Sequence, residues 1–355
     1  MNLIPLPTLY GIQEKILVIF PGALGDFICF LPALQKLAEG RRVDLLARSE
    51  YAALTPENVA TRSLECYEIN RLFVPGAEQD ERLREFFDSY RNIYSWMASS
   101  QPQFIRQLGN LSRNKPFIFP FRPSRTRMHM IDYYLSCVGM TPAEEVFPLI
   151  ALRPEAVSWS EDFWQKKRLT GGPVLVLAPG SGAAEKNWPI DHYNMVAEWW
   201  EKSVGGKSIV VLGPVEEEKL KAASIWRDVL VVKDLLLAQL AALLVRSDLY
   251  LGNDSGVTHL AAAVGAPTFA LFGPTDLLQW KPRGRQVTVI SQNAGCSPCT
   301  NSAMKRCLHH NCLITLNARA VITILQQAWR ASFGSRNAGR GNLDKGGGRD
   351  YSDYK

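Results

Sequence analysis

The chain has 355 residues, 46% of them hydrophobic and 21% charged, which suits two globular domains of ordinary soluble composition. With 40 Lys and Arg against 34 Asp and Glu, the formal net charge is +6. This mild excess is compatible with an anionic substrate or an anionic membrane surface, but it is too weak to argue for nucleic acid, and because the sequence carries no RNA- or DNA-binding signature we expect no nucleic-acid partner. The 7 cysteines do not resemble a secreted disulfide framework, and the sequence has no signal-peptide pattern, so we expect a cytoplasmic protein.

The first half of the chain opens with an apolar strand that leads into a glycine-containing turn. Residues 15–20 (KILVIF) are a continuous apolar run of strand length, and a helix is expected over 27–38. The turn between them, residues 21–26 (PGALGD), ends on Asp26, which stands where the helix begins. Further along, the pattern predicts strands at 43–47, 72–74, 93–97 and 117–121 and a helix at 79–90.

The second half alternates strands and helices more regularly. The composition changes around residues 151–172, and we place the domain boundary there, between residues 168 and 169. Beyond it, strands are expected at 174–178, 208–212, 229–232, 248–252 and 267–271, and helices at 190–203, 215–226, 235–246 and 256–264. Because each half starts with a strand and a glycine turn, we expect an α/β protein with two Rossmann-like, doubly wound domains facing across a cleft. The domains would cover 1–168 and 169–316, followed by an amphipathic helix at 317–333 and a disordered, glycine-rich tail at 334–355.

The stretch 249–272 has the pattern strand, tight turn, helix, strand, with its polar residues concentrated in the turn. Asp254, Ser255 and Gly256 belong to a cluster of turn formers and helix caps, and His259 follows within the first helical turns. Such a turn presents free N–H groups and the positive end of a helix dipole at the carboxyl edge of a parallel sheet, which suits a phosphate. The alternative is an ordinary strand-to-helix connection in which Asp254 only caps the helix.

Two other loops are expected at the same edge of the sheet. In residues 179–189 (PGSGAAEKNWP), the small Ser181 and Gly182 permit close approach of a ligand to the backbone, and Lys186 offers a point charge for a diphosphate. Residues 273–275 end the strand that follows the polar turn. The convergence of three such loops favours a nucleotide site over a purely structural role.

Two further features carry charge that a substrate could use. Glu216 follows a strand of the second half, where its carboxylate could accept hydrogen bonds from ribose hydroxyls. Arg122, Arg125 and Arg127, with His129 nearby, form a basic cluster in a loop of the first half. This cluster is either a solvated loop or a grip on a phosphate or carboxylate of a bound substrate.

A cysteine-rich segment lies near the end of the second half. Cys296, Cys299, Cys307 and Cys312 follow the spacing C-x2-C-x7-C-x4-C, and His309 and His310 stand before the last of them. This spacing is compatible with a small structural zinc site, with a reduced packing cluster or with redox-labile thiol pairs. The spacing does not choose among the three.

Four segments together resemble glycosyltransferase family 9, the ADP-heptose:lipopolysaccharide heptosyltransferases: residues 20–34, 179–189, 247–276 and 296–312. The resemblance implies the GT-B architecture, with an N-terminal acceptor domain, a C-terminal nucleotide-sugar domain and a last helix that packs back toward the N-terminal domain. It also implies inverting transfer of a heptose or related sugar from an ADP-sugar to an anionic, lipid-linked glycan of the lipopolysaccharide inner core, without metal or other cofactor. A cytoplasmic enzyme in peripheral contact with the inner membrane would suit that acceptor.

The resemblance also assigns roles to the polar side chains named above. Asp26 matches the proposed general base of the family, and Lys186 matches its diphosphate-binding lysine. The donor would be held by Ser181, Gly182, Lys186, Asp254, Ser255, Gly256 and His259, with Glu216 on the ribose, and the acceptor by Arg122, Arg125 and Arg127. The cysteine segment would then be structural, since the family needs no metal for transfer.

A single carboxylate fits this chemistry, because inversion at an anomeric carbon needs one base on the acceptor hydroxyl, opposite a departing diphosphate. For Asp26 the alternative is a helix N-cap. For the whole chain the alternatives are a nucleotide-sugar epimerase and a catalytically inactive nucleotide-sugar-binding protein of the same architecture. An NAD-dependent oxidoreductase is disfavoured because neither half carries G-x-G-x-x-G with a downstream acid.

Overall fold

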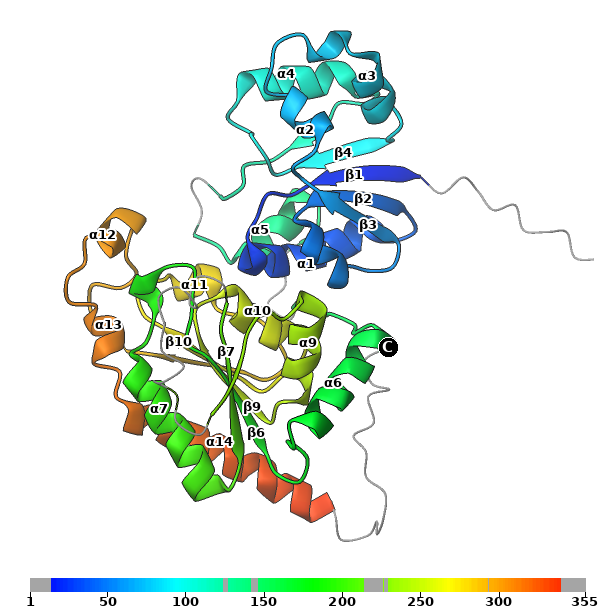
Figure 1. Ribbon diagram of the computed structural model, residues 1–355. Helices are drawn as coiled ribbons and strands as arrows, with labels where there is room; N and C mark the ends of the chain where they lie inside the picture. The colour runs from blue at the N-terminus through cyan, green and yellow to red at the C-terminus, as the bar shows by residue number, and fades with distance from the viewer. Residues whose placement is uncertain are drawn as a thin grey trace, which may run out of the picture. The chain divides into compact units, whose positions relative to one another are not determined.

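The computed structural model describes residues 14–123, 127–141, 146–213, 226, 229–292 and 294–339, with side chains up to residue 331. The chain forms two compact units (Figure 1). The first contains Met1–Gly22, Phe30–Thr126 and Ile131–Pro142, and the second contains Ala23–Cys29, Arg127–Met130 and Ala143–Lys355. The segment that carries Asp26, although early in the sequence, therefore belongs to the second unit.

The first unit is built on a five-stranded parallel sheet in the order β3-β2-β1-β4-β5. Its strands are β1 (Lys15–Ile19), β2 (Arg42–Ala47), β3 (Val59–Ser63), β4 (Asn92–Ser95) and β5 (Phe117–Ile118). The accompanying helices are α1 (Leu24–Ala38), α2 (Tyr67–Arg71), α3 (Glu81–Asp88), α4 (Pro102–Leu111) and α5 (Met130–Cys137), with short turns η1 (Ser49–Ala53) and η2 (Ala77–Gln79).

Helices cover both faces of this sheet (Figure 1). On one face Ile19 of β1 packs with Phe87 of α3 and Phe104 of α4. On the other face Phe20, which directly follows β1, stacks on Phe30 of α1 with 4.2 Å between the ring centroids. The strand order and the two helical layers confirm the predicted doubly wound sheet.

For the first unit one predicted strand is wrong and one strand was not predicted. Residues 72–74 form turns after α2 and no strand, and Gln107 of α4 donates from Nε2 to the carbonyl of Val74 at 3.0 Å. Such a short apolar run does not distinguish a strand from a buried turn. The pattern also misses β3, because this edge strand buries only Val59 and so lacks the apolar signal of a central strand.

The second unit is built on a six-stranded parallel sheet in the order β11-β10-β9-β6-β7-β8. Its strands are β6 (Val174–Ala178), β7 (Lys207–Val211), β8 (Leu230–Val232), β9 (Leu249–Asn253), β10 (Thr268–Phe272) and β11 (Val287–Ser291). Its helices are α6 (Pro154–Lys166), α7 (Ile190–Trp199), α9 (Leu237–Arg246), α10 (Gly256–Ala263), α11 (Leu277–Trp280), α12 (Asn301–Lys305), α13 (Asn311–Ile314) and α14 (Ala318–Gly339), with short helical turns η3 (Ala184–Lys186) and η4 (Trp200–Val204). The helix predicted at 215–226 lies outside the described residues except for Trp226.

Large apolar side chains fill the space between the second sheet and the helices α7 and α14. Val321 and Leu325 of α14 are fully buried in this core, and Trp329 meets Trp200 with 5.0 Å between ring centroids. The buried side chains of α14 thus pack in the core of their own unit, and the helix packing toward the N-terminal domain that the resemblance implied stays a prediction. The helix continues to Gly339, so the tail expected from residue 334 begins as helix, and its remainder lies outside the described residues.

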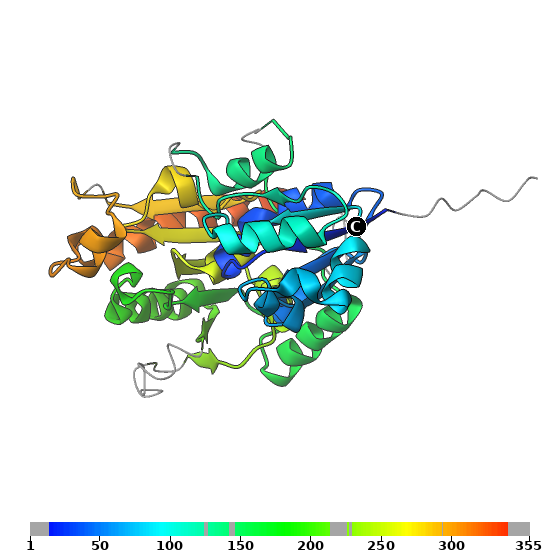
Figure 2. The ribbon, with the colours of Figure 1, turned by 90° about the horizontal axis from the view of Figure 1, so that it is seen from above.

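On the opposite face of the second sheet lie α9 and α10, and α6 packs on α9 (Figures 1 and 2). The guanidinium of Arg246 in α9 lies 5.3 Å from the ring centroid of Trp164 in α6, which is buried. A boundary between residues 168 and 169 would leave α6 in the first domain. Its packing on α9 places it in the second unit instead.

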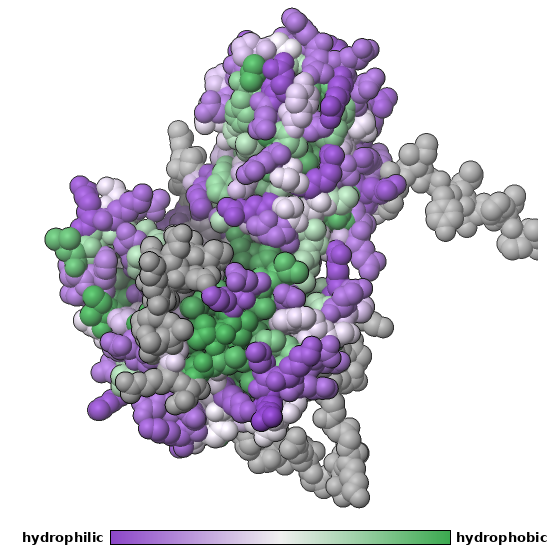
Figure 3. Space-filling view, in the orientation of Figure 1, coloured by the Kyte–Doolittle hydropathy of each residue, from purple (hydrophilic) through white to green (hydrophobic). Residues whose placement is uncertain are grey.

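The surface is mostly hydrophilic in the view of Figure 3, apart from an apolar area on the second unit. Exposed large apolar residues occur in both units, among them Phe73, Ile105, Leu236 and Leu308. No described helix combines the length and the apolar character that crossing a bilayer requires.

Candidate active site

Three loops that follow neighbouring strands meet at one edge of the second sheet. β9 lies between β6 and β10, with Ala178 opposite Gly252 and Leu271 opposite Asn253. Because all three strands are parallel, the loops after Ala178, Asn253 and Phe272 leave the sheet on the same side. These are the three loops that the sequence singles out.

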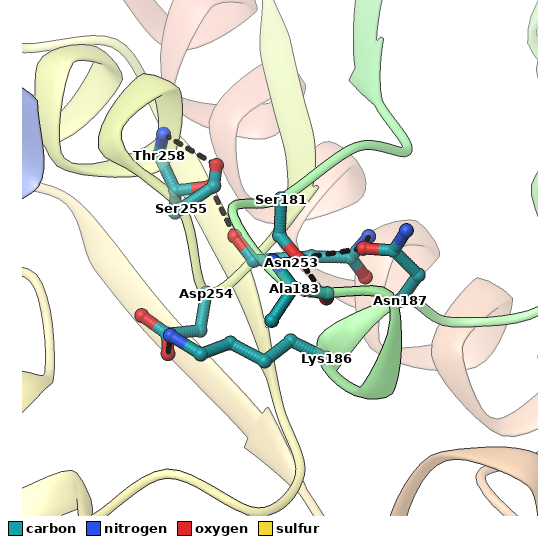
Figure 4. Close-up of polar contacts among 8 residues, drawn as sticks. All are labelled: Ser181, Ala183, Lys186, Asn187, Asn253, Asp254, Ser255 and Thr258. Carbon is teal, nitrogen blue, oxygen red and sulfur yellow. Dashed lines mark hydrogen bonds and ion pairs between the residues drawn. The ribbon is translucent and has the colours of Figure 1, made fainter. Parts of the chain in front are cut away.

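The side chains of Lys186 and Asp254 form an ion pair across two of these loops (Figure 4). Lys186 Nζ lies 2.8 Å from Asp254 Oδ2, and the side chains are 26% and 7% exposed. Lys186 ends the short turn η3, and Asp254 directly follows β9. The carboxylate therefore holds the ammonium group in one place at the sheet edge, where a diphosphate could accept from its remaining protons.

Ser255 and Gly256 start α10. Ser255 is the N-cap, and its Oγ accepts from the backbone N–H of Thr258 at 3.4 Å, so this hydroxyl serves the helix itself. A Cβ on Gly256 would lie 2.8 Å from the Cβ of Leu24 and 3.0 Å from the backbone nitrogen of Gly25. Glycine is thus required there, because the first turn of α1 packs directly on the first turn of α10.

This contact fixes where Asp26 lies. Asp26 is in the first turn of α1, is 9% exposed, and follows Gly25, whose added Cβ would lie 3.5 Å from the ring of His259. A carboxylate in the first turn of α1 interacts favourably with that helix dipole. The general-base candidate therefore lies in the same unit as the donor-site candidates, next to the start of α10.

His259 is buried below this contact. It is 3% exposed, and its Nδ1 lies 3.8 Å from the sulfur of Cys29. Burial lowers the pKa of His259 to about 4, with Asp254 raising it and Lys186 lowering it by smaller amounts. The imidazole is therefore neutral near pH 7, so it can offer hydrogen bonds to a ligand but no positive charge.

The remaining donor-site candidates are Ser181 and Gly182, which belong to the loop after β6, and Glu216. Ser181 is 9% exposed, and its Oγ lies 2.6 Å from Asn187 Oδ1 and 2.7 Å from the carbonyl of Ala183, so the hydroxyl stabilises its own loop. A Cβ on Gly182 would meet no atom within 4 Å, which leaves open space beside this residue. Glu216 lies outside the described residues.

Of the three arginines expected to bind an acceptor, the structure describes Arg122 and Arg127, and these two have different partners. Arg127 forms a two-pronged ion pair with Asp276: its Nη2 donates to Oδ1 at 2.7 Å and its Nε donates to Oδ2. This pair lowers the pKa of the Asp276 carboxyl, which also caps α11. Arg122 lies over the ring of Phe121, with 5.1 Å to the centroid, and Arg125 lies outside the described residues. Arg127 is thus engaged at the start of α11.

The cysteine segment, which includes α12 and α13, lies at one side of the second unit in both ribbon views (Figures 1 and 2). Ser297 Oγ donates to the carbonyl of Gly273 at 2.7 Å, and the backbone N–H of Cys299 donates to the carbonyl of Pro274 at 2.8 Å. Cys312 is buried and packs near Gly273. The segment therefore fastens the loop after β10.

The described geometry of this segment does not supply the zinc site that its spacing suggested. All four thiols are free, and within the described ranges no group of three or more His, Cys, Asp or Glu side chains is arranged to hold a metal ion. Cys307 lies near the ring of His309, at 3.7 Å from Nδ1, and Cys312 points into the core. Burial raises the pKa of Cys312, as expected for a packed thiol.

The hydrogen bonds at this sheet edge also involve residues to which the sequence analysis gave no role in the site. Asn253, Asn187 and Tyr193 link the loop after β6 to the end of β9 through buried hydrogen bonds. In the sequence this role is indicated only by an Asn at the end of a buried strand. Without knowledge of its long-range partners, such an Asn is interpreted as a turn former.

Comparison with known proteins gives a consistent result. The family description "Glycosyltransferase family 9 (heptosyltransferase)" matches residues 140–308. The lipooligosaccharide heptosyltransferase 2 of Campylobacter jejuni is 28% identical over 164 residues, which cover 43% of this chain and 50% of that protein. The lipopolysaccharide heptosyltransferase 1 of Pseudomonas aeruginosa is 29% identical over 130 residues, which cover 36% of this chain and 37% of that protein. The chain thus spans half or less of the curated relatives it matches.

Solved structures extend the likeness to the fold of nearly the whole chain. A glycosyl transferase of family 9 from Veillonella parvula superposes with a TM-score of 0.69 at 19% identity, covering 88% of this chain and 96% of that one. The Escherichia coli ADP-heptose lps heptosyltransferase II gives a TM-score of 0.66 at 18% identity, covering 88% and 98%. These matches confirm the expected GT-B class with two Rossmann-like units. Together the similarities show that this chain resembles the heptosyltransferases of glycosyltransferase family 9, in sequence over residues 140–308 and in fold over nearly its whole length.

Proposed function

We propose that this protein transfers a heptose, or a related sugar, from an ADP-sugar to a lipopolysaccharide inner-core glycan or a similar acceptor, with inversion at the anomeric carbon. The observation that carries the proposal is the Lys186–Asp254 pair, at 2.8 Å, on the edge of the sheet beside the N-terminus of α10. The names of the curated relatives, heptosyltransferases of lipopolysaccharide or lipooligosaccharide, support the donor and acceptor classes.

In this proposal the donor diphosphate binds between Lys186 and the first N–H groups of α10. The ammonium group and the helix dipole stabilise the negative charge that develops on the leaving ADP. The neutral His259 contributes hydrogen bonds rather than charge. Asp254 keeps Lys186 oriented, and the open space beside Gly182 leaves room for the donor.

Asp26 would be the general base. The acceptor hydroxyl oxygen attacks the anomeric carbon, its proton passes to the Asp26 carboxylate, and the bond from the sugar to the diphosphate breaks, with ADP taking the electron pair. The carboxylate is mostly buried, at 9% exposure, which protects it from bulk water. One base and one electrostatic clamp suffice for this chemistry, so we propose that transfer needs no metal or other cofactor.

The acceptor would be an anionic, lipid-linked glycan, and the enzyme would work in the cytoplasm in peripheral contact with the inner membrane. The net charge of +6 supports an anionic partner. Of the three arginines assigned to this acceptor, we keep Arg122 and Arg125 in the proposal, because Arg127 is paired with Asp276.

The test is to incubate the purified protein with ADP-heptose, and in parallel with other ADP-sugars, GDP-sugars and UDP-sugars, together with a truncated lipopolysaccharide acceptor. Mass spectrometry of the glycan should show one added heptose only with ADP-heptose. Interconversion of the free nucleotide sugar without transfer would favour the epimerase alternative. Binding of ADP-heptose with no product of either kind would favour the catalytically inactive protein.

A further inference from the structure

Asn253 is a polar residue with no exposed surface, placed at the end of β9 immediately before Asp254. A buried amide group is costly unless its donors and acceptors are all paired. Its partners therefore show what this residue holds together.

The amide of Asn253 is fully paired within the second unit. Its Nδ2 donates to the carbonyl of Pro179 at 2.6 Å and to Asn187 Oδ1 at 3.5 Å. Its Oδ1 accepts from the backbone N–H of Trp188 and from the hydroxyl of Tyr193, each at 3.0 Å. Figure 4 shows Asn253 beside Asn187, with the pair of Lys186 and Asp254 drawn close to them.

These partners mark both ends of one loop. Pro179 is where the chain leaves β6, and Trp188 is where it enters α7, so a single side chain fastens the beginning and the end of the segment that carries Lys186. The backbone of Asn253 leads directly into Asp254, which grips Lys186 at 2.8 Å. Asn253 thus binds the two ends of this loop, and Asp254 binds Lys186 within it.

We infer that Asn253 is a positioning residue for the donor diphosphate, acting through Lys186. The inference rests on the proposed function, since it concerns the same donor site. Neither a carboxylate nor an apolar side chain can replace the amide, because the site needs a donor facing Pro179 and an acceptor facing Trp188 at the same time. Burial raises the pKa of Tyr193 well above its usual range, so its hydroxyl stays protonated as a donor.

The experiment is a double-mutant cycle read by calorimetry with ADP, using the wild type, Asn253→Ala, Lys186→Ala and the double variant. We expect Asn253→Ala to weaken ADP binding about tenfold in the wild type but by less than about twofold when Lys186 is absent. Equal losses in both backgrounds would show that Asn253 does not act through Lys186, and an unchanged affinity in the single variant would overturn the inference outright.

The matched control is Asp248→Ala at the other end of β9. Asp248 is 8% exposed, and its Oδ2 accepts from the backbone N–H of Val174 at 2.8 Å, so it is also a buried polar link between β9 and β6. Both variants should lower the melting temperature, but only Asn253→Ala should change the affinity for ADP. Equal losses of ADP affinity in the two variants would mean that Asn253 only stabilises the fold, as Asp248 does, and would overturn the inference.

Two further outcomes are separable. If Asn253→Ala does not fold, Tyr193→Phe removes only one of the hydrogen bonds to Oδ1, and a smaller loss of ADP affinity with the same dependence on Lys186 is expected. An unchanged affinity in Tyr193→Phe would then count against the inference. If the wild type itself does not bind ADP, the proposed function is wrong and the inference is wrong with it. If the wild type binds ADP and Asn253→Ala binds it with the same affinity, only the inference is wrong.

Discussion

Gly25 and Gly256 lie so close that a Cβ on Gly256 would be 3.0 Å from the backbone nitrogen of Gly25. The first turns of α1 and α10 therefore meet with no side chain between them. Both helices direct the positive ends of their dipoles toward this contact, which is where Asp26 and the proposed diphosphate site lie.

Substituting Gly256→Ala should force these two turns apart. We expect the free energy of unfolding to fall by about 1–3 kcal/mol and turnover to drop, because overpacking displaces the turn that carries Asp26. Thermal unfolding and steady-state kinetics would measure the two effects. Gly109→Ala in α4 is the control, since a Cβ there meets no atom within 4 Å, and it should leave both quantities nearly unchanged or slightly raise stability.

Substituting Asp26→Asn should remove the proposed base while keeping the shape of the site. Turnover should fall by about 10²-fold or more, because proton transfer from the acceptor hydroxyl loses its acceptor. The affinity for the ADP-sugar, measured by calorimetry, should stay close to that of the wild type. Near-normal turnover in the purified variant would instead mean that Asp26 is not the base and only stabilises the start of α1.

Substituting Lys186→Ala should weaken ADP binding by about tenfold or more, since a charge-assisted contact to the diphosphate is lost. It should also reduce stability by about 1–3 kcal/mol, because Asp254 is left buried without its cation. Lys202→Ala is the control: its ion pair with Glu198 lies on the surface, with side chains 70% and 60% exposed, and its loss should change neither. Wild-type affinity for ADP in Lys186→Ala would remove this lysine from the donor site.

His259 should make the stability of the protein fall in mild acid. Its pKa is about 4 in the folded chain, below the value of 6.5 expected when the chain unfolds. Protons then bind preferentially to the unfolded chain, so the contribution of His259 is complete above pH 6.5 and is lost as the pH falls toward 4. The loss should amount to about 3 kcal/mol.

Denaturant unfolding of wild type and His259→Gln across this pH range would test that prediction. The variant should be less stable at pH 7 but show a flatter dependence between pH 6.5 and 4. His309→Gln, which changes an exposed histidine, serves as the control for the loss of an imidazole. A parallel slope in His259→Gln would mean that other groups account for the acid sensitivity.

Metal removal should leave the transfer reaction intact. After dialysis against a chelator, the rate of heptose transfer should match that of untreated protein, because Lys186 and the start of α10 would supply the charge that a metal supplies in other transferases. Elemental analysis of protein purified without added metal would report separately on Cys296, Cys299, Cys307 and Cys312. Loss of activity on chelation, with recovery on adding one metal, would contradict this prediction.

The sequence by itself determined the two doubly wound sheets and the edge at which the candidate donor loops gather. Buried central strands such as β1, β6 and β9 are continuous apolar runs, and each ends at a turn of small and polar residues. Because parallel strands share one carboxyl edge, local patterns were enough to place Lys186 and Asp254 on it.

Only the tertiary structure decided which polar groups touch. The contact between Cys29 and His259 spans 230 positions of the chain, and the amide group of Asn253 finds its partners 60 or more residues away. The ion pair of Arg127 with Asp276, in place of the substrate contact expected from the sequence, is likewise a long-range pairing. Local propensity carries no information on such pairings, since they are selected by the burial of whole elements against one another and by the need to pair every polar group that this burial encloses.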